Sequence, residues 1–292
     1  MNTLIAIDGN SLVNRAYYAL PEMSNREGVS TNAVYGFLIT LFNFIDINNA
    51  SHICVAFDRG SKTFRHRLFS EYKSNRGKMH DNLYKQLVIV HEILDRMNIL
   101  QLSYFEYEAD DIIGTISKMC DEVSLKCNIL SGDRDFLQLV SNNTEFTYIS
   151  TKNHKSVSKV YVLQSIQDEF GVQPYQLIDV KALMGDKSDC IPGVPGIGEK
   201  TALELIRKYH DLDNLCMNSE HLKMSLRQKL EDHMKSLYNS RRLAEIYRNI
   251  DIKVSLDDFK ITDLNVEPLK KILKQLELNS IIRRLESQKW KL

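Results

Sequence analysis

The chain has 292 residues, 43% of them hydrophobic, with 38 basic and 38 acidic side chains. This length and composition allow a large buried core and exclude a disordered chain. The zero net charge argues against a general binder of polyanions, although separated basic and acidic regions can also sum to zero. The five cysteines show no paired spacing typical of a zinc site or a disulfide framework, which favours reduced thiols.

The N-terminus opens with a strand-like apolar run at residues 4–7 and lacks the charged start and apolar core of a signal peptide. No apolar stretch is long enough to cross a bilayer. We therefore expect a cytoplasmic protein that does not associate with a membrane.

The first half of the chain alternates strand-like and helix-like segments. Strands are expected at residues 4–7, 53–57 and 127–130, and helices at 32–47, at 83–97 and after Glu108. This alternation predicts an α/β fold with a mostly parallel central sheet flanked by helices.

Helical patterning takes over from about residue 160. Helices are expected at residues 165–170, 175–184, 201–209, 234–247 and 267–285. We therefore predict two regions, an α/β domain at 1–170 and a helical region at 171–292.

Acidic residues follow apolar runs or form tight clusters along the chain, and three of these groups end expected strands. Ligand sites in open α/β sheets lie outside the carboxyl ends of the strands, so these carboxylates can meet in one place. Each close pair would repel by about 4 kcal/mol at 4 Å and an effective dielectric near 20. The nine acids are Asp8, Asp58, Glu108, Asp110, Asp111, Asp133, Asp135, Asp186 and Asp189.

Each acid taken alone also has a structural explanation, such as Asp135 capping the helix that begins at Phe136. The joint pattern favours a metal site, because Glu108 and Asp111 share a helix face, and Asp133 and Asp135 flank one turn. Ligation by oxygen alone is typical of Mg²⁺ or Mn²⁺. A two-metal centre of this kind suits phosphodiester hydrolysis.

A basic segment at residues 59–85 follows Asp58 directly and interleaves cations with aromatic rings. A solvated helix face is the simple explanation for such a run. Its position beside an acidic strand end favours another one, in which cations hold a phosphate and neighbouring rings stack on bases.

A glycine-rich stretch, from Ile191 to Ala202, leads into an expected helix and contains Gly196, Gly198 and Lys200. Glycines let a backbone approach a phosphate closely, and amides at a helix start bind the anion without reading a base. The pattern looks like a helix-hairpin-helix, expected at about residues 188–209, and Lys200 would add a charged contact.

These motifs together resemble the bacterial 5′-3′ exonucleases, or flap endonucleases, a family that includes the N-terminal nuclease domain of DNA polymerase I. The likeness covers nearly the whole chain in the same order, and we expect a free-standing member. It is carried by Asp8-Gly9-Asn10, Thr63-Phe64-Arg65-His66, Tyr72-Lys73-Ser74-Asn75-Arg76, Tyr107-Glu108-Ala109-Asp110-Asp111, Gly132-Asp133-Arg134-Asp135 and Gly185-Asp186-Lys187-Ser188-Asp189.

The resemblance implies a PIN-like nuclease fold with a helical arch at about 59–85, and a metal-dependent 5′-3′ exodeoxyribonuclease and flap endonuclease in replication and repair. It implies two Mg²⁺ or Mn²⁺ ions, with K⁺ at the hairpin as an option. One metal group would correspond to Asp8, Asp58, Glu108 and Asp110, and the other to Asp110, Asp111, Asp133, Asp135, Asp186 and Asp189. Lys73 and Arg76 would contact the scissile phosphate as catalytic residues. The expected DNA-binding residues are Arg15, Arg65, Tyr72, Lys73, Arg76, Gly196, Gly198 and Lys200.

We expect a monomer whose partner is DNA with single-strand/duplex junctions, such as 5′ flaps, nicks and 5′ overhangs. Two alternatives from other classes are a non-catalytic junction-binding scaffold and a PIN-type ribonuclease. Loss of acidic ligands would favour the scaffold, and none is lost; the ribonuclease would not need the hairpin.

Overall fold

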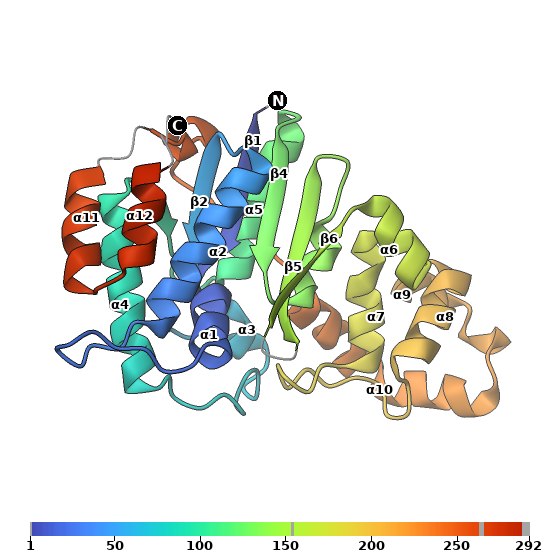
Figure 1. The fold of residues 1–292 in the computed structure, drawn as a ribbon. Coiled ribbons are helices and arrows are strands. Elements are labelled where there is room, and N and C mark those ends of the chain that lie inside the picture. The colour runs from blue at the N-terminus through green and yellow to red at the C-terminus, as the bar shows by residue number, and fades with distance from the viewer. Residues whose placement is uncertain (1, 153–154, 263–265, 288–292) are drawn as a thin grey trace.

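A central sheet carries strands in the order β3-β2-β1-β4-β5-β6 in the computed structural model, which describes residues 2–152, 155–262 and 266–287 (Figure 1). All neighbouring strands are parallel except β5 and β6, which form an antiparallel pair at one edge. The predicted mostly parallel α/β fold is therefore confirmed. The strands are β1 (Thr3–Asp8), β2 (His52–Ala56), β3 (Leu100–Leu102), β4 (Lys126–Ser131), β5 (Thr144–Lys152) and β6 (Lys155–Tyr161).

Helices cover both faces of the sheet because alternate residues of a strand point to opposite faces. Ile5 and Ile7 of β1 belong to one core cluster, and Leu4 and Ala6 belong to the other. The first cluster packs under α1 (Gly9–Ala19), α2 (Asn32–Asn48), α4 (Asp81–Arg96), α11 (Val266–Gln275) and α12 (Asn279–Ser287). No helix among the described residues is both long and apolar enough to cross a membrane.

The second cluster joins the sheet to the helical region. It runs from α5 (Ala109–Glu122) through the helices that follow β6. These helices are α6 (Leu163–Phe170), α7 (Leu177–Met184), α8 (Glu199–Tyr209), α9 (Leu212–Met217) and α10 (Met224–Ala244), with short 3₁₀ turns at Arg134–Leu139 (η1), Pro174–Gln176 (η2), Ser219–His221 (η3) and Leu256–Phe259 (η4).

The basic segment is only partly helical. A short helix, α3 (Phe64–Leu68), is followed by turns and irregular chain at residues 69–80, and then by α4. Lys73 adopts a left-handed backbone conformation with φ of 53°, which a continuous helix does not allow. The expected helical arch is therefore a short helix and a loop in this structure.

The last two helices do not belong with the other C-terminal helices. Leu269 and Leu273 of α11 and Ile281 of α12 are buried in the same cluster as α2 and α4. Figure 1 shows α11 and α12 beside α4, at the opposite end of the molecule from α8 and α9. The described part of residues 171–292 is mainly helical, as expected, but its last two helices return to the sheet and bury amphipathic faces there. The expected division into two regions at residue 170 stays a prediction.

Candidate metal centre

A cavity of about 530 Å³ opens where three parallel strands end, and four acidic side chains line it. Asp8 is the last residue of β1, while Asp58 and Asp133 each lie two residues beyond the ends of β2 and β4. Ile7 of β1 pairs with Val55 on one side and Leu130 on the other, so the three strand ends lie level. Asp110, in the first turn of α5, completes the group.

Asp8 is held in place by local hydrogen bonds. It caps α1, with Oδ1 accepting from the Ser11 amide at 2.9 Å and Oδ2 accepting from the Ser131 hydroxyl at 2.7 Å. Burial raises the pKa of Asp8 to about 7, and repulsion from Asp58 and Asp133 adds to the rise. The protein therefore orients this carboxylate but does not neutralise it.

The charge of Asp110 is compensated only in part, because Lys73 lowers its pKa but is outweighed. Burial raises its pKa well above the ordinary value, with repulsion from Asp133 and Asp8 as the next causes. Burial also raises the pKa of Asp58, although its Oδ1 accepts a hydrogen bond from the Ala109 amide at 2.9 Å. Four carboxylates that share a cavity and repel one another make a site suited to concentrated positive charge.

The carboxylates are oriented toward the cavity without forming a closed cage. Within residues 2–152, 155–262 and 266–287, no three acidic, histidine or cysteine side chains are close enough for a preformed metal site. Repulsion keeps such side chains apart, and Mg²⁺ usually takes only one or two carboxylates directly and keeps several waters. The oxygen-only donor set therefore fits a hydrated hard cation.

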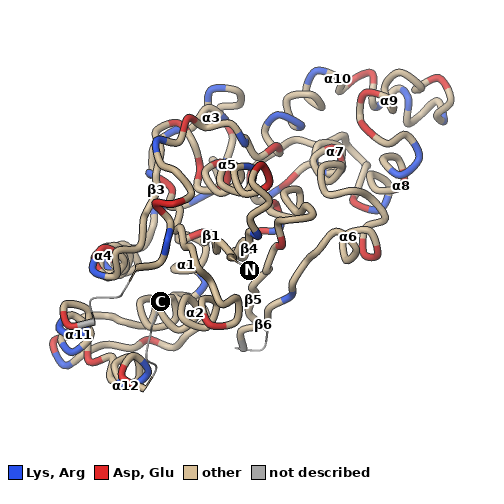
Figure 2. Tube along the Cα trace, turned by 90° about the horizontal axis from the view of Figure 1, so that it is seen from above, with Lys and Arg blue, Asp and Glu red and all other residues tan. Residues whose placement is uncertain are grey.

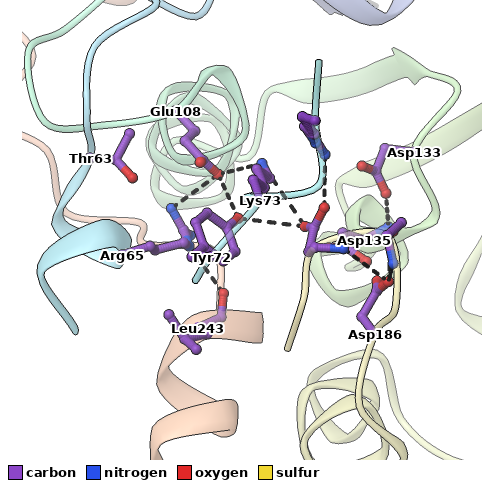
Figure 3. A network of polar contacts seen from close by, with 12 residues as sticks. Thr63, Arg65, Tyr72, Lys73, Glu108, Asp133, Asp135, Asp186 and Leu243 are labelled. Atoms are coloured by element: carbon purple, nitrogen blue, oxygen red, sulfur yellow. Dashed lines mark hydrogen bonds and ion pairs between the residues drawn. The ribbon is translucent and has the colours of Figure 1, made fainter. Parts of the chain in front are cut away.

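Two more of the expected ligands contact cations of the basic segment. Glu108 Oε2 accepts from Lys73 Nζ at 3.0 Å and from the Tyr72 hydroxyl at 3.1 Å. Asp189 Oδ1 accepts from Arg76 Nη2 at 2.7 Å. Figure 3 shows the Lys73 and Arg65 side chains converging on Glu108. Burial alone would lower the pKa of Lys73, but Glu108, Asp110 and Asp189 raise it, so this lysine stays charged beside the cavity.

The remaining pair, Asp135 and Asp186, is bridged by Lys181 of α7. Lys181 Nζ lies 2.5 Å from Asp135 Oδ1 and 2.6 Å from Asp186 Oδ2. Burial and repulsion from Asp133 raise the pKa of Asp135 to about 6 despite the lysine. For Asp186, burial is outweighed by Lys181 and Ser188, which lower its pKa to about 2.

Asp111 and Arg65 form a buried structural pair, which corrects two expectations. Asp111 is fully buried, and its carboxylate accepts hydrogen bonds from Arg65 Nη1 and Arg65 Nη2, both at 2.7 Å. Its carboxylate also accepts from the backbone amides of Glu108 at 3.0 Å and Tyr247 at 2.9 Å. Arg65, 2% exposed, also donates to the Leu243 and Glu245 carbonyls. Neither side chain is free to bind a metal or DNA.

Tyr72 is also buried rather than available for stacking on a base. It is 3% exposed, and its ring packs edge-on to His66 with the ring centroids 5.4 Å apart. Its hydroxyl donates a hydrogen bond to Glu108. Arg15 is half-buried and donates to Ser156 Oγ and Thr40 Oγ1, both at 3.2 Å. Arg15 lines a shallow cavity beside Gly132, next to the acidic group.

The glycine hairpin lies between α7 and α8. Gly193 packs so closely on Gly185 that an added Cβ would lie 2.4 Å from the Gly185 nitrogen. Gly196 has a φ of 82°, and Gly198 caps α8. Gly196, Gly198 and Lys200 are all exposed, so the expected anion-binding turn is open to solvent.

Several residues at the site were not anticipated from the sequence. Lys181 has no local signal, because its partners lie on other elements. Asn10 Oδ1 accepts from the Asp58 amide at 2.8 Å, and its place in the Asp8-Gly9-Asn10 motif was a usable signal. Asn14 and the exposed ring of Tyr18 also line the cavity.

Comparison with known proteins gives matches over most of the chain. Residues 3–171 match the family model of the 5′-3′ exonuclease N-terminal resolvase-like domain, and residues 172–267 match that of the 5′-3′ exonuclease C-terminal SAM fold. The fold is also similar to zinc-bound T5 5′-exonuclease, with a TM-score of 0.71 at 22% identity, covering 94% of this chain and 99% of that one.

Two curated relatives differ in length. A 5′-3′ exonuclease from Aquifex aeolicus is 37% identical, over 98% of this chain and 96% of its own. DNA polymerase I from Caldicellulosiruptor bescii is 40% identical over 97% of this chain, which spans only 33% of that relative. The chain belongs to the 5′-3′ exonuclease family.

Proposed function

We propose that this chain is a metal-dependent, structure-specific 5′ nuclease that hydrolyses DNA phosphodiesters at 5′ flaps and 5′ ends. The observation that carries the proposal is the acidic cavity at the ends of β1, β2 and β4, which Lys73 and Arg76 of the basic segment also line. Carboxylates and cations facing one cavity suit a phosphate that bridges metal ions and basic side chains.

Asp8, Asp58, Asp110 and Asp133 would hold the cations, with Glu108, Asp135, Asp186 and Asp189 acting directly or through water. The bound divalent ions, two Mg²⁺ or Mn²⁺, supply a nucleophile from water and stabilise the leaving oxygen. Lys73 and Arg76 would contact the scissile phosphate and offset charge that develops on it. Their carboxylate partners keep both cations beside the cavity.

The duplex would be gripped by the hairpin. The exposed backbone of Gly196 and Gly198 and the side chain of Lys200 suit contacts to phosphates without reading bases. The half-buried Arg15 can add a contact beside the cavity. We propose that the protein acts as a monomer in the cytoplasm on flaps, nicks and 5′ overhangs, with K⁺ at the hairpin as an option.

The test is incubation of the purified protein with a 5′-flapped duplex, labelled on the flap, in Mg²⁺ and in chelator. Metal-dependent cutting at the flap base is the expected result. Tight binding without cutting in Mg²⁺ or Mn²⁺ would replace the proposal by a non-catalytic junction binder. Preferred cutting of RNA would replace it by a ribonuclease.

A further inference from the structure

A second cavity, of about 670 Å³, lies outside the acidic centre and has an aromatic wall. We call it the Tyr247 pocket; Phe64, Arg67, Tyr107, Lys118, Arg242 and Tyr247 are among the residues that line it. They come from α3, the chain before α5, α5 itself, α10 and the chain after α10. Its volume is within the range of about 300–1,000 Å³ that is usual for ligand sites.

The three rings of this pocket form a compact cluster. Tyr107 and Tyr247 are stacked with centroids 5.6 Å apart and an interplanar angle of 15°. Phe64 lies 6.1 Å from Tyr107 and 6.3 Å from Tyr247. Tyr247 keeps 39% of its surface exposed, so part of the cluster remains open to a planar ligand.

The charges around the rings favour an anion. Of the six charged side chains that line the pocket, four are cationic, and the carboxylates are Glu106 and Glu245. Arg67 is paired with Glu106, Arg248 with Asp121 and Lys118 with Glu122. The side chain of Arg242 is exposed and makes no hydrogen bond or ion pair within the described ranges. An open ring beside an uncompensated guanidinium suits a base with its phosphate.

The pocket is joined to the acidic centre through the buried Arg65 network. Phe64 and Tyr107 directly precede Arg65 and Glu108, and the Tyr247 amide donates to Asp111. Arg65 Nη1 lies 3.4 Å from the same Glu108 oxygen that accepts from Lys73. One network therefore positions the pocket wall and a cation of the cavity.

We propose that the Tyr247 pocket binds one nucleotide of the single-stranded 5′ flap, with its base on Tyr247 and its phosphate near Arg242. This proposal rests on the proposed nuclease function, because a flap held at the cavity supplies the single strand. Stacking tolerates any base, so the pocket adds affinity for a single strand without sequence preference.

The test measures affinity in chelator, where no cutting occurs, for a DNA hairpin carrying a 5′ oligothymidine flap and for the same hairpin without a flap. Arg242→Glu and Tyr247→Ala should each weaken flap binding about tenfold, as expected for loss of a phosphate contact or one base stack. Binding of the flapless hairpin should stay unchanged, and Tyr247→Phe should bind the flap as the wild type does.

Lys274→Glu is the matched control, because it reverses one exposed charge on α11, which Figure 2 shows at the opposite end of the molecule from α10. Equal weakening on both hairpins, or unchanged flap binding by the Arg242→Glu variant, would overturn the pocket assignment. Cutting of the flap by the wild type in Mg²⁺ separates the two proposals: if it occurs while the pocket variants bind normally, only the pocket assignment fails.

Discussion

The four cavity carboxylates and the Asp135–Asp186 pair belong to one acidic constellation, yet the protein treats their charges differently. Around Asp8 and Asp110 the charge is left largely uncompensated, and burial and mutual repulsion raise both pKa values. Lys181 compensates the charge of Asp186, whose pKa falls to about 2, and part of the charge of Asp135, whose pKa burial and Asp133 still raise to about 6. An acidic sequence motif therefore does not distinguish carboxylates whose charge the protein leaves largely uncompensated from carboxylates that already pair with a lysine of the same chain.

Asp111 extends this comparison, because its buried charge is fully paired with Arg65. Arg65→Met would leave its buried carboxylate unpaired and should lower the free energy of unfolding by about 3–5 kcal/mol. Urea denaturation measures the loss. Arg65→Met combined with Asp111→Asn should recover part of it, because asparagine keeps an acceptor for the Glu108 amide. Equal losses in the single and double variants would contradict an ion pair as the cause.

Lys181→Met would turn the compensated pair into an uncompensated one. We expect a loss of about 3 kcal/mol in chelator, at the low end of the range for a broken buried pair, since these carboxylates remain partly accessible. Mg²⁺ should stabilise the variant more than the wild type in urea denaturation. Lys253→Met, which breaks an exposed pair with Asp251, is the control and should change little. If the Lys181→Met variant is as stable as the wild type, Lys181 does not compensate the Asp135–Asp186 pair, and this pair does not differ from the cavity carboxylates.

Asp133→Asn tests the uncompensated group by removing charge while keeping the acceptor for the Asp135 amide. Flap cutting in Mg²⁺ should fall at least about 100-fold, equivalent to about 2.7 kcal/mol. Binding of the flapped duplex in chelator should be retained. Asp251→Asn, at an exposed carboxylate away from the cavity, should cut normally. Full activity of Asp133→Asn would remove Asp133 from the proposed ligands.

The raised pKa of Asp8 predicts a pH dependence of stability. A carboxyl with a pKa of about 7 in the fold and 3.8 as its ordinary value binds its proton more tightly when folded. Its contribution to stability is therefore present below pH 4 and is lost as pH rises toward 7. In chelator, the wild type should lose about 2 kcal/mol more than Asp8→Asn between pH 5 and pH 7.5. Mg²⁺ should abolish this difference, and parallel pH profiles without metal would refute the assignment.

The sheet and the cavity acids were predictable because their signals are local. Apolar runs at residues 4–7, 53–57 and 127–130 mark buried strands, and the acids that follow them must share an edge when the strands are parallel. The hairpin of β5 and β6 was not anticipated, because this edge pair alternates polar residues without a long apolar run. The first ten residues of α10 were missed for a similar reason, since their charged side chains bury little surface.

The partners of individual charged side chains were not predictable from the sequence. Arg65 lies in a run of cations that looks suited to phosphate, yet it pairs with an aspartate 46 positions away in the chain. In the sequence, Lys181 looks like a surface residue of a short helix, but in the fold it forms ion pairs with two carboxylates. Such pairings depend on how distant elements pack, and no periodicity or spacing in the sequence records them.

The return of α11 to the sheet has a consequence for the order of events during synthesis. α4, which begins within the basic segment, is buried in part by α11, a helix more than 160 residues later in the chain. During synthesis, all nine acidic residues and the glycine hairpin therefore precede α11, the helix that completes the packing around α4.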